Sequence, residues 1–541
     1  MSKSTMVRGA LLLTSATFLT KFLGMIYVIP FNAMIGEEGG ALFQYAYIPY
    51  SILITLSTIG LPSAVSKFVS KYNSLEDYYT GLRMFKVGMK IMAVTGILAF
   101  LILFFGAESL AKIMLADADI VNNSVEDVTM VIRMVSIALI IIPSMSIFRG
   151  FFQGNESMGP TAVSQVVEQI VRIIFLLTAV FLIINVFNGT IATAVGFATF
   201  AAFIGAIASY TVLLYFWRKR KPYIDKKIAQ QTRTSDLTTK DLATELLSYA
   251  GPFVFFAIAI PLVQLVDTVT FNRAMIKIGQ GDVTEMMLGT INFTSHKLVI
   301  MPATLASGLS IALLPVITSS FTKQNGQALK DQINQAIQII IVLVIPASLG
   351  ITLLSDEVYG SLFGMGKLDT TSSILAWYAP VAVLFALSSV TAIIMQGINQ
   401  QNTAVIHLFI GILAKVLLNT QFIYMFGAKG SIYATALAFA IPVLLNLWKI
   451  KKTVDLPIKP LIKRTMLVGI FVTFMAIAIW IIKFVLGLLV AYEESRFGLS
   501  IMLVLGVMFG GLTYLWFAYK STLLERVLGE RVRVLERIFG K

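Results

Sequence analysis

Seven ionisable residues lie inside long apolar stretches of this sequence, where few charges would be expected. They are Lys21, Glu168, Arg172, Asp267, Arg273, His296 and Lys297. A charged side chain within a membrane helix costs about 3 kcal/mol on insertion scales, so such residues normally face a water-filled cavity or a charged partner. Lysine and arginine bind phosphates and other anions through their N–H donors. The four cations in this set are therefore candidate ligands for an anion.

The spacing of these charges suggests which of them act together. Glu168 and Arg172 are four residues apart, on one helical face and in the favourable order for an ion pair. Such a pair fits a structural lock and a cavity lining equally well, and Asp267 or His296 could supply further cavity charge. Lys21 and Lys297 have no acidic neighbour in their own helices. They need an anion or a carboxylate from elsewhere, and Asp267 is the obvious one.

Other charged or polar residues in apolar stretches have simpler explanations. We expect Arg133, Arg149 and Lys483, which lie near predicted helix ends, to extend their charged groups toward water. We expect His407 to form a hydrogen bond that packs helices, rather than to carry protons. Lys415 lies in the middle of a predicted helix.

Composition defines the environment of these residues. Of 541 residues, 57% are hydrophobic and only 13% are charged, and the mean hydropathy is +0.84. These values exclude a soluble multidomain protein and predict an all-α polytopic membrane protein. Without cysteine and with two histidines, neither disulfides nor a conventional zinc site is expected. We interpret the net charge of +14 as basic cytoplasmic loops rather than a nucleic-acid surface.

A membrane crossing needs about 20 mostly apolar helical residues, and fourteen stretches meet this criterion. They cover approximately residues 10–35, 43–69, 87–106, 130–150, 161–186, 190–217, 247–276, 287–320, 333–354, 372–396, 403–426, 430–449, 464–489 and 497–519. The connections after the second, sixth and twelfth stretches are basic, whereas those assigned to the other side are acidic or nearly neutral. This alternation predicts a multi-pass membrane protein with both termini in the cytoplasm.

Two halves of the chain repeat each other at an offset of about 240 residues. Gln153-Gly154 returns as Gln396-Gly397, and the Thr-Ala-Val at 161–163 returns at 403–405. The repeat predicts two pseudo-symmetric six-helix lobes with a transport site between them. The predicted parts are lobe 1–217, basic cytoplasmic linker 218–245, lobe 246–450, two extra helices in 451–520 and an amphipathic cytoplasmic tail, 521–541. No phosphate-binding loop motif occurs, and we expect a transporter rather than an enzyme.

Four motifs carry a family resemblance that extends over nearly the whole chain. They are TKFLG (20–24), EEGGALFQYAY (37–47), GLPSAVSKFVSKY (60–72) and RGFFQGNESMGPTAVSQVVEQIVR (149–172). With the plan of twelve plus two helices, they resemble the polysaccharide-exporter branch of the multidrug/oligosaccharidyl-lipid/polysaccharide (MOP) superfamily. Within this branch, the sequence is similar to the MurJ-type lipid II flippases of Gram-positive bacteria and to their spore-cortex relatives.

The resemblance implies a central cationic cavity lined by the first, second, seventh and eighth helices, with a groove along the last two helices for a polyprenyl tail. Lys21 and Lys297 match cavity arginines of the family. Tyr27 and the uncharged middle of the second helix replace further cations found in Gram-negative relatives, so either Arg172 or Arg273 compensates or the phosphate is held differently. The resemblance also implies a location in the bacterial cytoplasmic membrane.

The implied substrate is an undecaprenyl-diphosphate-linked glycan, which the protein would translocate by alternating access among membrane lipids. No cofactor is expected, and the residues leave open whether Na⁺, H⁺ or the membrane potential alone drives transport. A monomer and contacts with cell-wall synthesis proteins are both compatible with the sequence. A flippase for teichoic acid, capsule or spore-cortex material is an alternative, and a drug/cation antiporter is disfavoured because cations dominate the predicted cavity.

Overall fold

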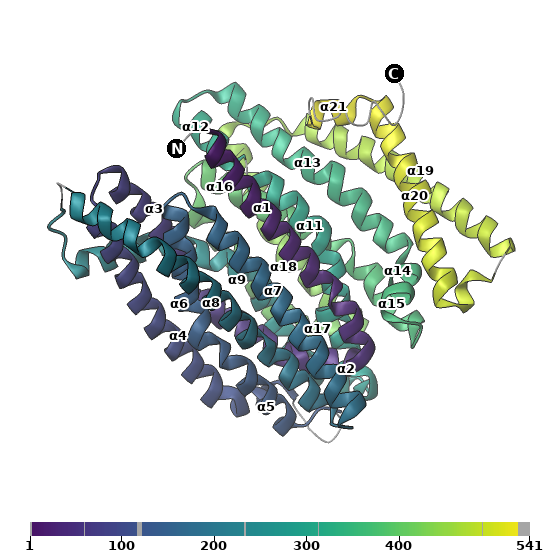
Figure 1. Ribbon diagram of the computed structural model, residues 1–541. Helices are drawn as coiled ribbons and strands as arrows, with labels where there is room; N and C mark the ends of the chain where they lie inside the picture. Colours follow the sequence, from purple (N-terminus) through teal and green to yellow (C-terminus); the bar gives the residue numbers. More distant parts are fainter. Residues whose placement is uncertain are drawn as a thin grey trace. The chain divides into compact units, whose positions relative to one another are not determined.

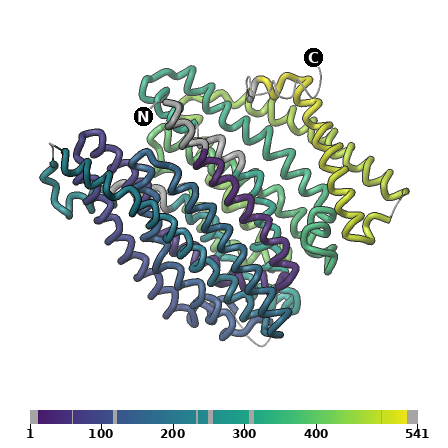
Figure 2. Tube along the Cα trace, viewed as in Figure 1, coloured from purple at the N-terminus to yellow at the C-terminus, as the bar shows by residue number. Residues whose placement is uncertain are grey.

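A computed structural model describes residues 3–58, 60–115, 122–231, 234–311, 313–489 and 491–528, and all regular elements in these ranges are helices. The chain divides into two compact units, Met1–Arg273 and Ala274–Lys541. Figure 1 labels the helices, and Figure 2 traces the same chain from its purple N-terminus to its yellow C-terminus. The all-α class predicted from composition is confirmed.

The first unit packs long helices around an aromatic core. Its elements are α1 (Lys3–Ile26), α2 (Val28–Thr58), α3 (Leu61–Ser74), α4 (Tyr78–Leu115), α5 (Val125–Ser136), α6 (Ala138–Gly154), α7 (Met158–Phe181), η1 (Leu182–Val186), α8 (Ile191–Gln230) and most of α9 (Thr239–Lys277). Phe85 of α4 lies 5.0 Å from Phe148 of α6 and 4.9 Å from Trp217 of α8, measured between ring centroids. These aromatic contacts join three helices of the unit.

The second unit contains η2 (Gly281–Val283), α10 (Thr284–Gly289), η3 (Thr290–Ser295), α11 (His296–Ile311), α12 (Leu314–Thr322), α13 (Gly326–Leu353), α14 (Ser355–Phe363), α15 (Leu368–Tyr378), α16 (Val381–Gly397), α17 (Gln401–Phe426), α18 (Ala428–Val454), α19 (Ile458–Leu489), η4 (Tyr492–Glu494), α20 (Arg496–Lys520) and α21 (Leu523–Leu528). Helix α17 packs along α18, and α19 along α20. Of the predicted amphipathic tail, 521–541, residues 529–541 lie outside the described residues.

The repeated Gln-Gly corners adopt the same local structure in both units. In the first, Glu156 has a φ of +55° and its N–H donates to the carbonyl of Gln153. In the second, Asn399 has a φ of +56° and its N–H donates to the carbonyl of Gln396. The sequence repeat is thus also a structural repeat at these two helix ends.

The glycine of each corner is required for close packing. A Cβ on Gly154 would lie 2.6 Å from the carbonyl oxygen of Ser66 in α3. A Cβ on Gly397 would lie 2.6 Å from Cγ2 of Ile317 in α12. Both distances are shorter than the non-bonded contacts that a Cβ atom makes in proteins. Each corner glycine therefore lets one helix end approach a neighbouring helix.

Twelve stretches of the described residues are long and apolar enough to cross a membrane, whereas the sequence predicted fourteen. The first stretch, Leu12–Ser74, has 63 residues. It comprises most of α1 together with α2 and α3, and it is long enough for more than one crossing, since each crossing needs about 20 residues. The predicted crossing at 287–320 is divided among α10, η3, α11 and α12. The polytopic class is therefore clear, and the count of fourteen stays a prediction.

The predicted linker, 218–245, is largely helical. Helix α8 continues to Gln230 and α9 begins at Thr239. Hydropathy alone ends a helix where polar residues begin, but lysine, arginine, isoleucine and alanine are good enough helix formers to continue one into water. The boundary between the compact units also falls within α9 rather than in this linker. The lobe boundaries inferred from the repeat stay a prediction.

Candidate functional site

Glu168 pairs with an arginine on another helix rather than with its predicted partner, Arg172. Nη2 of Arg149 in α6 lies 2.5 Å from Oε2 of Glu168 in α7. The same nitrogen donates to Ser209 of α8 at 2.8 Å, and Nε donates to Ser164 of α7 at 3.1 Å. The expectation that Arg149 extends toward water is wrong, because the α6–α7 corner returns the chain and brings Glu168 within reach. This ion pair joins three helices.

Arg172 instead lies beside aromatic rings of α2. Its guanidinium carbon is 5.7 Å from the ring centroid of Tyr47. That ring stacks on Phe43 at 5.3 Å and approaches Tyr50 at 5.7 Å. A cation over an aromatic face is stabilised by the ring quadrupole without being neutralised. Arg172 is half-buried, and its side chain is also hydrogen-bonded to that of Tyr47.

The other predicted site residues of the first unit differ in exposure. Lys21 is exposed on α1, which packs against α7. Gly24, one turn further along α1, permits this approach, since a Cβ there would lie 3.3 Å from Nε2 of Gln169. Asp267 of α9 is buried, with only 2% of its surface exposed, whereas Arg273 near the end of that helix is exposed.

His296 and Lys297 begin α11 in the second unit. Nδ1 of His296 lies 2.8 Å from the hydroxyl of Tyr378 in α15, and the imidazole also contacts Phe385 at 6.0 Å between ring centroids. Lys297 is half-buried. The π-helix η3 directly precedes both residues, and such distortions are frequent at functional sites. Lys21 and Lys297 belong to different units, so the chamber that they would share stays a prediction.

The second unit contains an apolar groove between α13, α14, α19 and α20, with a volume of about 380 Å³. Tyr514, whose hydroxyl is the main polar group of the lining, donates it to the carbonyl of Val342 at 2.7 Å. Gly506 lets α20 approach Leu354 closely, because a Cβ at this position would lie 2.7 Å from the Leu354 side chain. Other lining residues are Pro346, Ile351, Met475, Ile479 and Val507. The lining of this groove is thus almost wholly apolar.

Sequence reasoning missed a second ion pair beside this groove. Nζ of Lys483 in α19 lies 2.8 Å from Oε1 of Glu357 in α14 and donates to the carbonyl of Leu353 at 3.0 Å. Lys483 was expected to extend toward water. Burial raises the pKa of Glu357 above its ordinary value, although the bond from Lys483 opposes this shift. No sequence spacing links two residues so far apart, so only the packing of α14 on the last two helices reveals the pair.

Two polar helix-packing residues of the second unit are satisfied internally. Nδ1 of His407 lies 2.8 Å from Oδ1 of Asn446, which confirms its predicted packing role. Lys415 is fully buried and donates to the carbonyl of Ser431 at 3.0 Å and to Thr435 at 2.8 Å. Both residues are thus held by hydrogen bonds between α17 and α18.

Long apolar helices, internal repeats and buried charges together define a polytopic membrane protein of the transporter type. Comparison with solved structures agrees. Over 96% of this chain and 99% of the other, the fold resembles the lipid II flippase MurJ in an inward closed conformation, with a TM-score of 0.66 and 18% identity. A multidrug resistance MATE family transporter of the MOP superfamily, in its inward-facing conformation, matches 82% of this chain and 98% of its own with a TM-score of 0.62 and 14% identity.

Sequence comparison identifies the family. Residues 6–321 match the polysaccharide biosynthesis protein family. The lipid II flippase MurJ of Bacillus subtilis is 46% identical over 98% of both chains. The stage V sporulation protein B of that organism is 25% identical over 82% of this chain and 81% of its own. The chain therefore belongs to the polysaccharide biosynthesis protein family, in the MurJ-type group that its motifs predicted.

Proposed function

We propose that this protein is a flippase that moves lipid II, the lipid-linked peptidoglycan precursor, from the inner to the outer leaflet of the cytoplasmic membrane. The observation that carries this proposal is the 46% identity to the lipid II flippase MurJ of Bacillus subtilis over 98% of both chains. The molecule would act by alternating access and would leave the substrate chemically unchanged, so it is not an enzyme.

The charged head of the substrate requires cations. A diphosphate cannot enter hydrocarbon unaided, and lysine and arginine in a water-filled chamber replace its hydration. We assign this role to Lys21, Lys297, Arg172 and Arg273, with Asp267 as their counter-charge in the empty carrier. Arg172 suits this role because its observed partner is Tyr47, through the aromatic ring and a side-chain hydrogen bond, rather than a carboxylate.

The remaining site residues have different roles in this proposal. Glu168 braces α6, α7 and α8 through Arg149 and does not bind substrate. His296 holds α11 against α15 through Tyr378 and so orients the neighbouring Lys297. The apolar groove of the second unit receives part of the polyprenyl tail.

Charge also supplies the orientation and part of the driving force. The basic connections would face the cytoplasm, as would both termini. An inside-negative potential favours outward movement of an anion by about 2.3 kcal/mol per charge per 100 mV. We propose that the membrane potential is the primary driving force. The test is to collapse the potential while a Na⁺ or H⁺ gradient is kept. Transport that continues under these conditions would identify the coupling ion.

A flippase for a different polyprenyl-linked glycan is the second candidate. It is favoured by the similarity to stage V sporulation protein B and by a 27% identity over 28% of this chain to a probable low-salt glycan biosynthesis flippase, Agl15 of Haloferax volcanii. Depleting the protein in its own host distinguishes the two. Lipid II should accumulate in the inner leaflet; accumulation of another lipid-linked glycan instead would select the second candidate.

Substitutions of the two central lysines test the mechanism. Lys21→Ala and Lys297→Ala should each abolish complementation of a depleted strain while protein levels in the membrane stay normal. Lys21→Arg and Lys297→Arg, which keep the charge, are the matched controls and should complement. Full complementation by both alanine variants would remove these lysines from the mechanism.

A further inference from the structure

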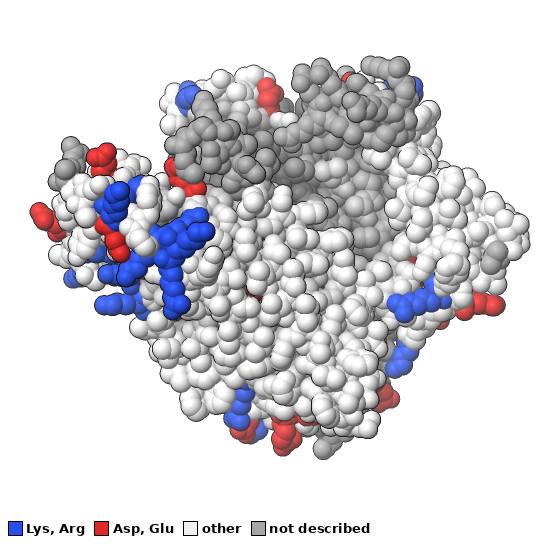
Figure 3. Space-filling model, viewed as in Figure 1, with Lys and Arg blue, Asp and Glu red and all other residues white. Residues whose placement is uncertain are grey.

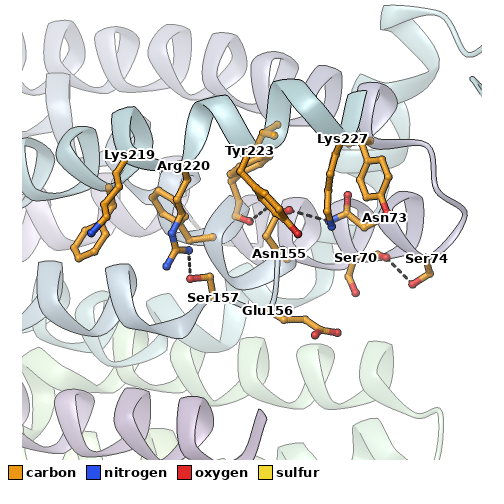
Figure 4. Close-up of a pocket in the computed structure, with 17 residues that line it drawn as sticks. Ser70, Asn73, Ser74, Asn155, Glu156, Ser157, Lys219, Arg220, Tyr223 and Lys227 are labelled. Carbon is orange, nitrogen blue, oxygen red and sulfur yellow. Dashed lines mark hydrogen bonds between the residues drawn. The ribbon is translucent and has the colours of Figure 1, made fainter. Parts of the chain in front are cut away.

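A cavity of about 840 Å³ lies in the first unit, away from every predicted site residue. It is enclosed by α3, α4, α6, the corner after α6 and the last turns of α8 (Figure 4). Figure 3 shows lysine and arginine side chains gathered on the surface over this part of the unit, with several acidic side chains beside them, while most of the face shown is uncharged. A hollow beneath a local concentration of cations calls for an anionic ligand.

Helix α8 presents a row of side chains to the cavity. Arg220, Tyr223 and Lys227 follow one another at spacings of three and four residues, which places them along one helical face. Lys219 precedes Arg220 directly and lies one turn before Tyr223. In Figure 4 they extend from α8 toward the corner that contains Ser157. The cavity lining thus has three cations from a single helix.

The contacts of Arg220 and Lys227 hold these two side chains in place without neutralising their charges. Arg220 donates to the hydroxyl of Ser157, and its guanidinium lies 5.5 Å from the ring centroid of Phe152. Nζ of Lys227 lies 4.7 Å from the ring centroid of Tyr78 and 5.1 Å from that of Tyr223. These partners are a hydroxyl and aromatic faces, so both positive charges stay available to a ligand.

Neutral hydrogen-bonding groups complete the lining. Asn73 donates to Asn155 at 3.0 Å, and Ser70 and Ser74 lie beside them. The single carboxylate of the lining belongs to Glu156, whose side chain extends away from the α8 row in Figure 4. Three cations against one carboxylate leave a net positive cavity.

The position of the cavity along α8 identifies the source of the anion. This helix has 40 residues and is about 60 Å long, twice the thickness of the hydrocarbon core. The helix is therefore too long to lie wholly within the hydrocarbon. Its basic end is the part suited to the membrane–water interface, where aromatic and cationic side chains together meet lipid headgroups. We propose that this cavity binds the phosphate-bearing headgroup of an anionic phospholipid, at a site separate from the transport pathway.

The test compares binding of defined lipids to the purified full-length protein in neutral detergent. Short-chain phosphatidylglycerol is the probe, phosphatidylcholine tests the requirement for net charge, and inorganic phosphate tests whether a free anion suffices. Native mass spectrometry counts bound lipid. Phosphatidylglycerol should bind at least fivefold more tightly than phosphatidylcholine, with no displacement by millimolar phosphate.

Matched charge removals localise the site. The double variant Arg220→Gln/Lys227→Gln should weaken phosphatidylglycerol binding at least fivefold. Lys227→Gln alone, which leaves Arg220 and its bond to Ser157 intact, should weaken binding to a smaller extent. The control Lys221→Gln/Lys226→Gln removes two exposed charges of the same helix that do not line the cavity, and it should change binding less than twofold.

Three results would overturn the proposal. Equal losses in the two double variants would indicate diffuse surface attraction. Equal binding of phosphatidylcholine would exclude recognition of the anion, and displacement by phosphate at similar concentration would assign the cavity to a free anion. None of these readouts requires transport, so the outcome is independent of the proposed flippase activity.

Discussion

Helices α6, α7 and α8 of the first unit are joined by Arg149, whereas Asn446 joins the repeat counterparts α16, α17 and α18 without an ion pair. Lys415 separately bonds α17 to α18. Arg149 binds Glu168 of α7 and Ser209 of α8. In the second unit, Asn446 of α18 contacts His407 of α17 at 2.8 Å and donates to Thr391 of α16 at 3.3 Å.

This difference shows that the repeated three-helix joint does not require charge. When one partner is removed from a hydrogen-bond network without an ion pair, the other partner is left unsatisfied, which costs about 1–3 kcal/mol. An ion pair that loses one partner leaves a poorly solvated charge behind, which costs more. The first unit is therefore the more sensitive of the two, and the following substitutions test that contrast.

The largest effect is expected from Arg149→Met. Glu168 would keep its charge at a position where its side chain is 23% exposed, so unfolding should become easier by about 3 kcal/mol. Unfolding in detergent, followed by temperature or denaturant, measures the loss. The double variant Arg149→Met/Glu168→Met should recover most of it; a single variant that loses less than about 1 kcal/mol would contradict the contrast.

Two equivalent helix starts provide the next comparison. Oδ1 of Asp77 accepts from the N–H of Thr80 at 3.0 Å where α4 begins, and Oδ1 of Asn325 accepts from that of Ala328 at 3.2 Å where α13 begins. Asp77 also accepts two bonds from Ser235. Asp77→Ala should destabilise by about 2 kcal/mol and Asn325→Ala by about 1 kcal/mol. Equal losses would mean that the bonds from Ser235 contribute nothing.

Only the first of these helix starts should depend on pH. Burial alone raises the pKa of Asp77, but hydrogen bonds from Ser235 and Thr80 outweigh it and hold the pKa below the ordinary value of about 3.9. The stabilisation is therefore complete above that value and is lost as pH falls through the lower pKa of the folded state. The stability difference between the native protein and Asp77→Asn should be constant from pH 7 to 5 and should shrink below pH 4.

A smaller loss is expected from His407→Ala in the second unit. The substitution removes the bond to Asn446 but leaves no charge, so the cost should be about 1.5 kcal/mol. His407→Gln, which can donate to the same oxygen, is the control and should recover about half of this loss. A cost as large as that of Arg149→Met would refute the idea that the neutral joint is less sensitive.

The smallest stability effect is expected from Lys415→Met. Lys415 is one position out of register with Arg172 in the repeat alignment and is fully buried. Lys415→Met loses the two hydrogen bonds to α18 but also removes the cost of burying a charge. These two effects oppose each other, so the net change should stay within about 1 kcal/mol. Lys415→Met should also complement a depleted strain, whereas Arg172→Met should fold and fail to complement. Failure of Lys415→Met would give both repeats a role in transport.

Several features of the fold were predictable because they depend on local patterns. Apolar runs, basic and acidic connections and the repeated Gln-Gly corner indicated an all-helical membrane protein built from two related halves. The residues that carry unusual charges were also visible in the sequence. Helix ends were less predictable, since hydropathy does not register that α8 continues to Gln230 beyond the apolar stretch.

The pairing of charges was the least predictable feature. The spacing of Glu168 and Arg172 indicated an ion pair within one helix, yet Glu168 pairs with Arg149 and Arg172 lies beside Tyr47. A charged partner four residues away in the same helix competes with every side chain that neighbouring helices bring near. The sequence shows the partner in the same helix but not those on neighbouring helices. The pair of Lys483 with Glu357 was missed for the same reason.

The sequence by itself determined the environment of this protein, the length and polarity of its helices and the list of charges that need an explanation, because these follow from residue type and spacing. Only the tertiary structure decided which charges are paired, which stay available and where cavities form. The physical reason is that a low-dielectric interior makes charge pairing strongly dependent on distance, and the distances between helices are set by packing contacts far apart in the chain.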